Sequence, residues 1–421
     1  MSNDTNELLS MLNDVASQKT SELEVQSPAN SQTTTTTQPI HSSQTLQQAY
    51  LNLQKIMIYA AEKNASDIFI APEFPPAVKI NGKITPLSSK PFTAENTRET
   101  VLSTMTPKQI KQFHEELEIN YAIKANADVR FRVNAYHEQG RMGMVMRKIN
   151  TEIATLDELK LPDILRDLVL ERRGLIIVVG ATGSGKSTTM AAMLDHRNKL
   201  QAGHIVTIED PVEYVHRHQK SIVTQREVGM DTLSWHAALK SAMREAPDVV
   251  VIGEVRDEES MSRALELAQT GHLCLCTLHA TNANQAVERV INFYEEARHA
   301  QVYMDLALNL KAIISQRLVV KKDGTGRAVA MDILLNNPAV QDLVFKGDIG
   351  GIKEIMNRAQ DEGMQTFDQH LLRLYIDGTI DYEEALRNAD SINDLRLSIK
   401  LWEEGQSKKT VFDRVNNLNL M

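Results

Sequence analysis

Cysteine is nearly absent from this chain. Its two cysteines, Cys274 and Cys276, form a single C-x-C pair in 421 residues. A disulfide framework needs more cysteines, and a zinc site needs more ligands at wider spacing. We therefore interpret both as buried strand residues of a protein in a reducing compartment.

An excess of basic charge is also missing. The chain has 55 acidic and 46 basic residues, a net charge of −9 at pH 7, and only 5% aromatic residues. Proteins that bind nucleic acid usually carry a basic surface, often with aromatic side chains on which bases stack. These counts argue against nucleic acid as a partner.

No apolar run approaches the roughly 20 residues that a helix needs to span a bilayer. The N-terminus, Met1 to Asp4, lacks the apolar core of a signal peptide. We therefore expect a cytoplasmic protein that does not insert into a membrane and that reaches one only through partners.

Composition divides the chain into four parts. Residues 1–44 are rich in Ser, Thr, Gln and Asn, which predicts a disordered polar arm. Residues 45–155 predict a small α/β domain, and residues 165–400 predict a second, larger one. Residues 401–421 are polar and charged, as in a loose tail.

The arm contains one apolar pattern. Leu8, Leu12 and Val15 stand at helical spacing, which is compatible with a transient helix or with a helix that docks on a partner.

The small domain shows several strand signals. Strands are predicted at residues 66–70, 129–134 and 142–147. Asn81-Gly82, which lies between alternating apolar residues of 78–84, predicts a hairpin.

The larger domain begins with short, nearly continuous apolar runs at residues 175–179, 205–208, 249–252 and 273–276. Such runs are typical of strands that are buried on both faces of a mostly parallel sheet. Residues 301–401 are expected to be mainly helical. The pattern predicts an α/β fold.

A phosphate-binding motif follows the first of these runs. Gly180 to Ser187 reads GATGSGKS, which fits G-x-x-x-x-G-K-[ST], between a predicted strand and a predicted helix. The glycines let backbone N–H groups surround phosphates at a helix N-terminus. Lys186 is predicted to reach the β- and γ-phosphates of ATP, and the Ser187 hydroxyl to coordinate Mg²⁺. The predicted nucleotide contacts are Gly180, Ala181, Thr182, Gly183, Ser184, Gly185, Lys186, Ser187 and Thr188.

Polar residues also flank the other apolar runs. They lie in residues 208–213, residues 252–257 and the pair of segments 270–272 and 277–279. Ligands of open α/β sheets bind beyond the carboxyl ends of the strands, so acidic and His side chains there can reach a γ-phosphate or its Mg²⁺. Taken singly, each has another explanation, as a solvated acid or a hydrogen-bonded loop His.

Together these segments resemble the secretion ATPase superfamily. Residues 180–187, 208–213, 252–257 and 270–279 are similar, in order, to its Walker A motif, Asp box, Walker B motif and His box. The resemblance covers about residues 50–400. It points to the type IV pilus retraction branch, PilT and PilU, because the tetracysteine zinc element of the extension and secretion ATPases is missing. Three segments are most similar to PilU, namely 278–286, 363–369 and 385–397.

The resemblance implies a PAS-like N-terminal domain followed by a RecA-like ATPase domain, six copies in a ring, and the use of ATP and Mg²⁺. Arg132 and Arg147 match arginines that reach the nucleotide. Glu209 is implied as the base that activates water, and Glu254 as a Mg²⁺ ligand through water, although the two roles could be exchanged. His279 is implied as a γ-phosphate sensor.

The resemblance also implies a function and partners. The function is ATP-driven pilus retraction, or twitching motility, with a PilT-like paralogue and the inner-membrane platform protein of the pilus as partners. Two alternatives stay open. One is a nucleotide-gated accessory subunit that supplies little force alone, and the other, less favoured, is a RecA-like nucleic-acid motor.

Overall fold

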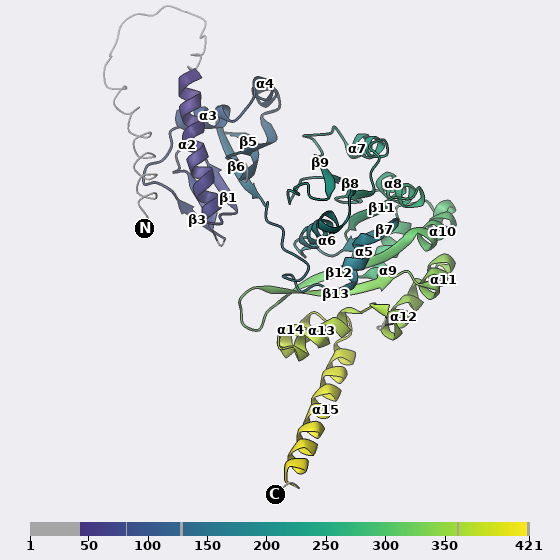
Figure 1. The fold of residues 1–421 in the computed structure, drawn as a ribbon. Helices are drawn as coiled ribbons and strands as arrows, with labels where there is room; N and C mark the ends of the chain where they lie inside the picture. Colours follow the sequence, from purple (N-terminus) through teal and green to yellow (C-terminus); the bar gives the residue numbers. More distant parts are fainter. Residues whose placement is uncertain (1–42, 81, 127–128, 360–361, 419–421) are drawn as a thin grey trace, which may run out of the picture. The chain divides into compact units, whose positions relative to one another are not determined.

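The computed structural model describes residues 43–80, 82–126, 129–359 and 362–418. It divides into two compact units, residues 1–151 and residues 152–421 (Figure 1). Nearly all of the predicted arm, including Leu8, Leu12 and Val15, lies outside the described residues. Among the helices that are described, none is long and apolar enough to cross a membrane.

The first unit is built on a six-stranded antiparallel sheet with the order β3-β2-β1-β6-β5-β4. Its strands are β1 (Asp67–Ile70), β2 (Ala77–Ile80), β3 (Lys83–Pro86), β4 (Glu118–Lys124), β5 (Arg130–Glu138) and β6 (Arg141–Ile149). Its helices are α2 (Ser43–Glu62), α3 (Ala94–Ser103) and α4 (Pro107–Glu116).

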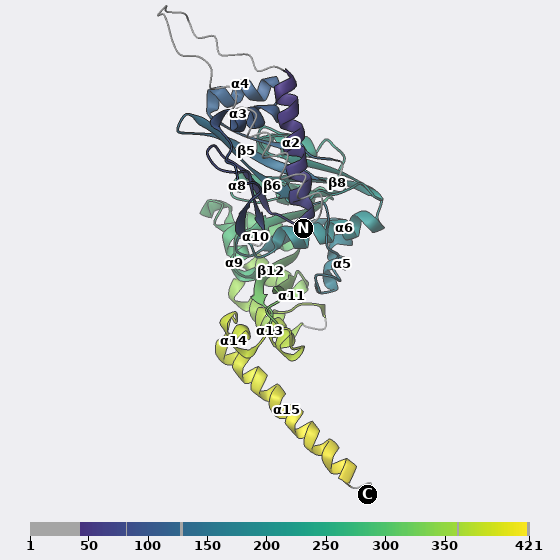
Figure 2. The same cartoon turned by 90° about the vertical axis from the view of Figure 1, so that its left-hand side faces the viewer.

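The apolar side chains of these helices share one core with alternate residues of the sheet, and α2 lies beside α3 (Figure 2). All three helices therefore cover the same face of the sheet. The predicted hairpin is present, since Ile80 pairs with Lys83 across β2 and β3. Asn81 of its turn lies outside the described residues.

The second unit contains a seven-stranded sheet with the order β13-β12-β7-β11-β10-β8-β9. All neighbouring strands are parallel except the antiparallel pair β12 and β13. The strands are β7 (Gly174–Val179), β8 (Gly203–Glu209), β9 (Ser221–Glu227), β10 (Val249–Ile252), β11 (Leu273–Leu278), β12 (Leu310–Val320) and β13 (Arg327–Leu335).

Helices follow most of these strands. They are α5 (Ile164–Leu170), α6 (Lys186–Leu200), α7 (Trp235–Ala242), α8 (Glu258–Gln269), α9 (Ala283–Ile291), α10 (His299–Asn309), α11 (Pro338–Lys346), α12 (Ile352–Arg358), α13 (Phe367–Ile376), α14 (Tyr382–Arg387) and α15 (Ile392–Leu418), with short 3₁₀ turns η1 (Glu296–Arg298) and η2 (Ile349–Gly351).

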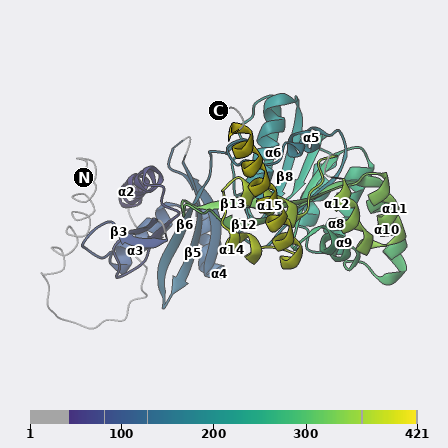
Figure 3. The ribbon, with the colours of Figure 1, turned by 90° about the horizontal axis from the view of Figure 1, so that it is seen from below.

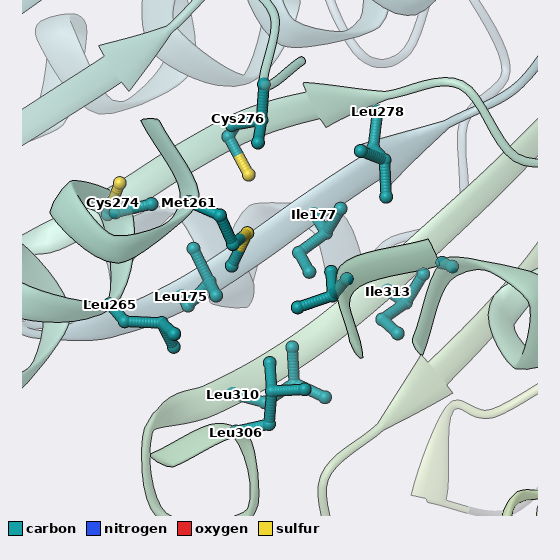
Figure 4. Packing of buried hydrophobic residues seen from close by; sticks show 14 of the residues in the cluster. Leu175, Ile177, Met261, Leu265, Cys274, Cys276, Leu278, Leu306, Leu310 and Ile313 are labelled. Atoms are coloured by element: carbon teal, nitrogen blue, oxygen red, sulfur yellow. The ribbon is translucent and has the colours of Figure 1, made fainter. Parts of the chain in front are cut away.

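The apolar runs are buried on both faces, as predicted. Along β7, Leu175 and Ile177 face a core shared with α7 to α12, whereas Ile176 and Val178 face a core shared with α5 and α6. Figure 4 shows the first of these cores, in which both cysteines pack near Met261 and Leu265 of α8. Cys274 and Cys276 are buried and free, which confirms the strand interpretation.

The prediction that residues 301–401 are mainly helical is wrong for residues 310–335. This segment forms the β12–β13 hairpin, and β12 joins the central sheet beside β7. The far end of the hairpin shares a third, smaller core with α13, α14 and α15. Helix α15 then extends away from α13 and α14 (Figures 1 and 2; Figure 3 shows α15 from below) and runs to Leu418, so residues 401–418 are helical in the structure and not a loose tail.

One buried acid links β12, β13 and α9. Asp332 is 4% exposed and accepts a hydrogen bond of 3.1 Å from Ser315, its partner in the strand register. Burial raises the pKa of Asp332 to about 7, and the negative charge of Asp390 acts in the same direction. The hydrogen bonds from Ser315 and from the Ala283 N–H, and the charge of Lys353, oppose this increase.

This pKa predicts a pH-dependent stability. Because the folded-state pKa lies above the ordinary value of 3.8, the folded chain holds a proton that the unfolded chain releases. The stabilising contribution is complete below about pH 4 and is lost as the pH rises through about 7. Asp332→Asn cannot ionise and keeps an acceptor for Ser315, so its melting temperature should exceed that of the wild type by several degrees at about pH 8.

The advantage of Asp332→Asn should shrink towards about pH 5, as followed by thermal melts of both proteins across this range. Asp342→Asn is the matched control, because Asp342 is exposed on α11, where it pairs with Lys346. A difference between Asp332→Asn and the wild type that stays constant with pH would contradict the assignment.

Candidate functional site

The carboxyl ends of the parallel strands meet at one edge of the sheet. Val179 at the end of β7 pairs with Leu278 of β11 and with Ser315 of β12. On the other side, Ile252 of β10 lies between Cys276 and Ile208. The residues that follow these strands, in the Walker A motif, Asp box, Walker B motif and second half of the His box, therefore share this edge.

The first half of the predicted His box lies elsewhere. His272 precedes β11, at the opposite edge of the sheet, and its backbone N–H and ring contact the carbonyl of Leu267. Thr270 accompanies it there through a contact of 3.1 Å between Thr270 Oγ1 and His272 Nδ1. These side chains support the end of α8, and only residues 277–279 of this box lie at the phosphate-binding edge.

The phosphate-binding loop requires glycine at its base. Gly180 has φ of +148°, and a Cβ there would lie 2.6 Å from the backbone oxygen of Gln316. Gly185, with φ of +89°, directly precedes α6, and a Cβ there would lie 3.1 Å from Gln316 Nε2. Both ends of the loop therefore contact β12 so closely that a side chain would not fit there without displacing Gln316. Between them, Ala181, Thr182 and Gly183 are exposed.

The Lys186 side chain is hydrogen-bonded to the start of the loop. Its Nζ donates hydrogen bonds to the carbonyls of Gly180 at 2.8 Å and Ala181 at 3.0 Å. Burial lowers the pKa of Lys186, and the negative charge of Glu254 partly offsets this effect. An ammonium in this position is available for an anion that enters the loop.

The next residues of α6 differ in accessibility. Ser187 is exposed in the first turn, whereas the Thr188 hydroxyl lies 2.8 Å from the Tyr214 hydroxyl. The Thr188 hydroxyl is therefore hydrogen-bonded to the loop that follows β8. If Thr188 contacts a nucleotide as predicted, its backbone N–H is the group that can do so.

Glu209 ends β8 with its carboxylate largely out of solvent. Oε1 accepts hydrogen bonds from Thr207 Oγ1 at 2.6 Å and from Gln225 Nε2 at 3.2 Å. Burial raises the pKa of Glu209, and these bonds and the Glu213 N–H oppose the increase, while the charge of Glu213 adds to it. A raised pKa suits a carboxylate that accepts a proton during a reaction.

Glu254 stands in a different environment. Its Oε2 is paired with Arg256 at 2.5 Å, and its Oε1 lies 2.8 Å from His279 Nε2. The structure therefore pairs Glu254 with His279, for which the sequence predicts separate roles, and Lys186 lies close enough to interact electrostatically with Glu254. Gly253 lets the two acidic segments approach, because its N–H donates to Ile208 at 2.8 Å and a Cβ would lie 3.2 Å from Glu209 Cα.

The donor set fits Mg²⁺ bound together with phosphate. The Ser187 hydroxyl and the Glu254 carboxylate offer hard oxygen ligands, which Mg²⁺ prefers. Among the described residues, no group of three or more His, Cys, Asp or Glu side chains could hold a metal alone. Mg²⁺ bound with a nucleotide usually takes most of its ligands from phosphates and water.

Arg132 and Arg147 belong to the first unit and lie on neighbouring strands, as predicted. They are directly paired across β5 and β6, so both side chains project from the same face of the sheet. Arg147 Nε donates to Asp67 Oδ1 at 3.0 Å, and Asp67 is buried. The two guanidinium groups thus lie on one face of the sheet, and a guanidinium can bind phosphate oxygens with two parallel hydrogen bonds.

Several residues of the site were not assigned a role from sequence. Arg256 pairs with Glu254, Gln225 holds Glu209, Tyr214 contacts Thr188, and Gln316 contacts the phosphate-binding loop. Arg256 could have been noticed, since it lies in the Walker B segment. Gln225 and Gln316 interrupt strand patterns without any motif, so no local signal indicates their contacts.

Comparison with known proteins agrees with this geometry. A family model described as "Type II/IV secretion system protein" matches residues 43–387. The chain belongs to this family of secretion-system ATPases. Within it, the chain is 53% identical to the type IV pilus ATPase PilU of Pseudomonas aeruginosa over 357 residues, 85% of this chain and 94% of that protein.

Other members of the family support the same branch. The chain is 37% identical to the type IV pilus retraction ATPase PilT of Pseudomonas aeruginosa, over 80% of this chain and 98% of that protein. The crystal structure of the pilus retraction motor PilT with bound ADP superposes with a TM-score of 0.76 at 38% identity, covering 82% of this chain and 98% of that one. The chain is thus a PilT/PilU-type secretion ATPase with the same α/β architecture.

The two glutamate environments generate a prediction. Glu209→Gln keeps the shape of the side chain but cannot accept a proton, so ATP binding should persist while turnover falls by about 10²-fold or more. Steady-state turnover and nucleotide affinity should be measured for Glu209→Gln and Glu254→Gln in parallel. Glu354→Gln, a change at an exposed residue of α12 that pairs with Arg358, serves as control. Turnover that survives in Glu209→Gln but not in Glu254→Gln would assign the base to Glu254 instead.

Proposed function

We propose that this chain is a magnesium-dependent ATPase that works as a ring of six and couples ATP hydrolysis to retraction of type IV pili. The observation that carries the proposal is the convergence of Lys186, Glu254 and His279 beside the phosphate-binding loop. The likeness to two pilus ATPases over most of the chain supports the type IV pilus as the machine on which this ATPase acts.

The residues divide the chemistry between them. Backbone N–H groups of the loop and the Lys186 ammonium bind the phosphates and balance their negative charge. Glu209 orients the attacking water and takes its proton, since its raised pKa favours the protonated product of that transfer. Water adds to the γ-phosphorus, the bond to the ADP oxygen breaks, and ADP and phosphate leave.

Bound Mg²⁺ would supply charge neutralisation on the phosphates, with Ser187 as a direct ligand and Glu254 as a ligand through water. His279, held against Glu254 at 2.8 Å, is placed to sense whether a γ-phosphate is present. Loss of the γ-phosphate would then alter the Glu254–His279 pair, which is a local change that a motor can transmit.

The proposal extends to partners. The load is a pilus subunit or the inner-membrane platform protein, which the chain reaches from the cytoplasm. A PilT-like paralogue is a further partner, because PilU and PilT of Pseudomonas aeruginosa are separate proteins of one bacterium and both resemble this chain.

The likeness to PilU and PilT also supports a second candidate function. The chain is 53% identical to PilU and 37% identical to PilT, so it resembles one member of a pair more than the other. A member of such a pair can serve as a nucleotide-gated accessory subunit that adds little force by itself. Retraction in cells that lack this chain but keep the paralogue distinguishes the two candidates.

Lys186→Ala tests the proposed function directly. Removal of the ammonium should abolish ATP turnover, while circular dichroism and melting temperature remain close to those of the wild type, because the Lys186 ammonium donates its hydrogen bonds to carbonyls of the loop and not to the core. Cells that carry this variant should lose the retraction that depends on this chain. Lys199→Ala, at the far end of α6, is the control. Wild-type turnover by purified Lys186→Ala would refute the ATPase assignment.

The arginine pair generates a separate prediction. We propose that Arg132 and Arg147 stabilise the charge on the transferring phosphoryl group, as arginine fingers do. Replacement of either by Lys keeps the charge but removes the guanidinium fork, so turnover should fall by about 10-fold or more with little change in ATP affinity. Lys at position 147 also leaves a cation beside Asp67.

Arg141→Lys is the matched control for both variants. Arg141 lies on β6 of the same sheet and pairs with Glu73 at 2.7 Å. Turnover equal to that of the wild type in both Arg132→Lys and Arg147→Lys would exclude the clamp.

A further inference from the structure

Gln316 lies beneath the phosphate-binding loop. It follows Ser315 on β12, which pairs with Val179, the last residue of β7 before Gly180. Its side chain is 1% exposed, and Nε2 donates a hydrogen bond of 2.6 Å to the carbonyl oxygen of Ser184. This bond joins β12 to the middle of the loop.

The two ends of the loop contact the same residue. A Cβ on Gly180 would lie 2.6 Å from the Gln316 carbonyl oxygen, and a Cβ on Gly185 would lie 3.1 Å from Gln316 Nε2. The backbone and side chain of Gln316 thus meet the loop at its start, at Ser184 and at its end. A different side chain at this position would change the surface on which the loop rests.

The bond to Ser184 also sets the direction of a phosphate-binding group. A trans peptide is planar, and its C=O and N–H point in opposite directions. Because the Ser184 carbonyl points to Gln316, the N–H of Gly185 in the same peptide points away from β12. Backbone N–H groups of such loops bind phosphate oxygens, and a Gly185 N–H that points away from β12 suits that role.

The neighbouring residue holds the strand in place. Arg317 projects to the other face of β12, where its guanidinium lies 3.9 Å from the ring centroid of Phe367. It also donates to the Asn388 carbonyl at 2.8 Å and to Asp390 Oδ1 at 2.7 Å. These contacts with the C-terminal helices fix β12 on one side while Gln316 supports the loop on the other.

A buried glutamine at position 316 lowers the stability of the fold, because one of its two polar groups is not hydrogen-bonded to any described residue. Within the part of the chain that the structure describes, its buried Oε1 has no hydrogen-bond partner. A buried acceptor without a partner destabilises the folded state. An apolar side chain would avoid that cost but could not donate to Ser184. The donor is therefore the property that this position uses.

We propose that Gln316 is a positioning residue for nucleotide binding, which aims the Gly185 N–H at the phosphates through the Ser184 carbonyl. The inference rests on the proposed ATPase function and adds a residue outside the four family boxes. Because the loop binds phosphates in ATP and ADP alike, loss of this bond should weaken the binding of both nucleotides more than it slows the chemical step.

The test uses Gln316→Met, which keeps the length of the side chain but removes the donor. Its affinity for ADP, measured by calorimetry on the full chain, should fall by about 10-fold, and KM for ATP should rise in parallel. Its kcat should stay within about threefold of the wild type. Gln316→Glu is the second variant, and its carboxylate, which cannot donate at neutral pH, should bind ADP at least as weakly.

Gln365→Met is the matched control. Gln365 is another buried glutamine, 4% exposed, whose Nε2 donates to the carbonyl of Met331 at 3.2 Å on β13. Its loss should lower the melting temperature without changing ADP affinity. A general packing effect would lower affinity in both methionine variants, and that result would overturn the proposal.

Two further outcomes separate this proposal from the proposed function. If the wild type hydrolyses ATP and Gln316→Met or Gln316→Glu binds ADP within about twofold of it, the positioning role is wrong and the ATPase assignment stands. If the wild type itself binds neither ADP nor ATP, the proposed function fails and the positioning role fails with it.

Discussion

The parallel register of β8, β10, β11, β7 and β12 is the constraint on which the rest of the second unit depends. These strands are buried on both faces, so their backbone groups bond to neighbouring strands and most of their side chains are apolar. Most of the charged groups of the site therefore lie at or beyond the strand ends, and the few polar residues within the strands, such as Thr207 and Gln316, are hydrogen-bonded. Because the strands run in the same direction, the segments that follow them collect at one edge of the sheet.

That edge places two carboxylates in different environments. Glu209 is half-buried, and the loss of solvent around its carboxylate raises its pKa although neutral donors hydrogen-bond to it. Glu254 faces cationic and titratable partners, Arg256 and His279, and its charge acts on Lys186. Paired acids in unlike surroundings are a common basis for different roles in catalysis. Here the difference follows from which strand each residue ends and what lies beside it.

Strand β12 connects three parts of the second unit. It adds to the central sheet beside β7, supports the phosphate-binding loop through Gln316, and holds the C-terminal helices through Arg317. Successive strand residues point to opposite faces, so neighbouring residues can serve different layers. The nucleotide site and the third core are thus attached to the same rigid element, which gives the C-terminal helices a direct structural connection to the loop.

Features that depend on short stretches of chain could be predicted from the sequence alone. The glycine-rich loop, the buried apolar runs and the Asn81-Gly82 hairpin each follow from local preferences of consecutive residues. The helical expectation for residues 310–335 failed because an apolar run fits a buried helix as well as a buried strand, and pairing with β7 decides between them.

Contacts between side chains that are distant in sequence depend on how the whole chain folds. Gln316 and Ser184 are 132 positions apart, and their contact exists because β12 inserts beside β7. The pairing of Glu254 with His279 likewise depends on β10 lying beside β11, and that of Arg132 with Arg147 on the register of β5 and β6. Strand order and register are set by the packing of the whole sheet, so no local pattern specifies these contacts.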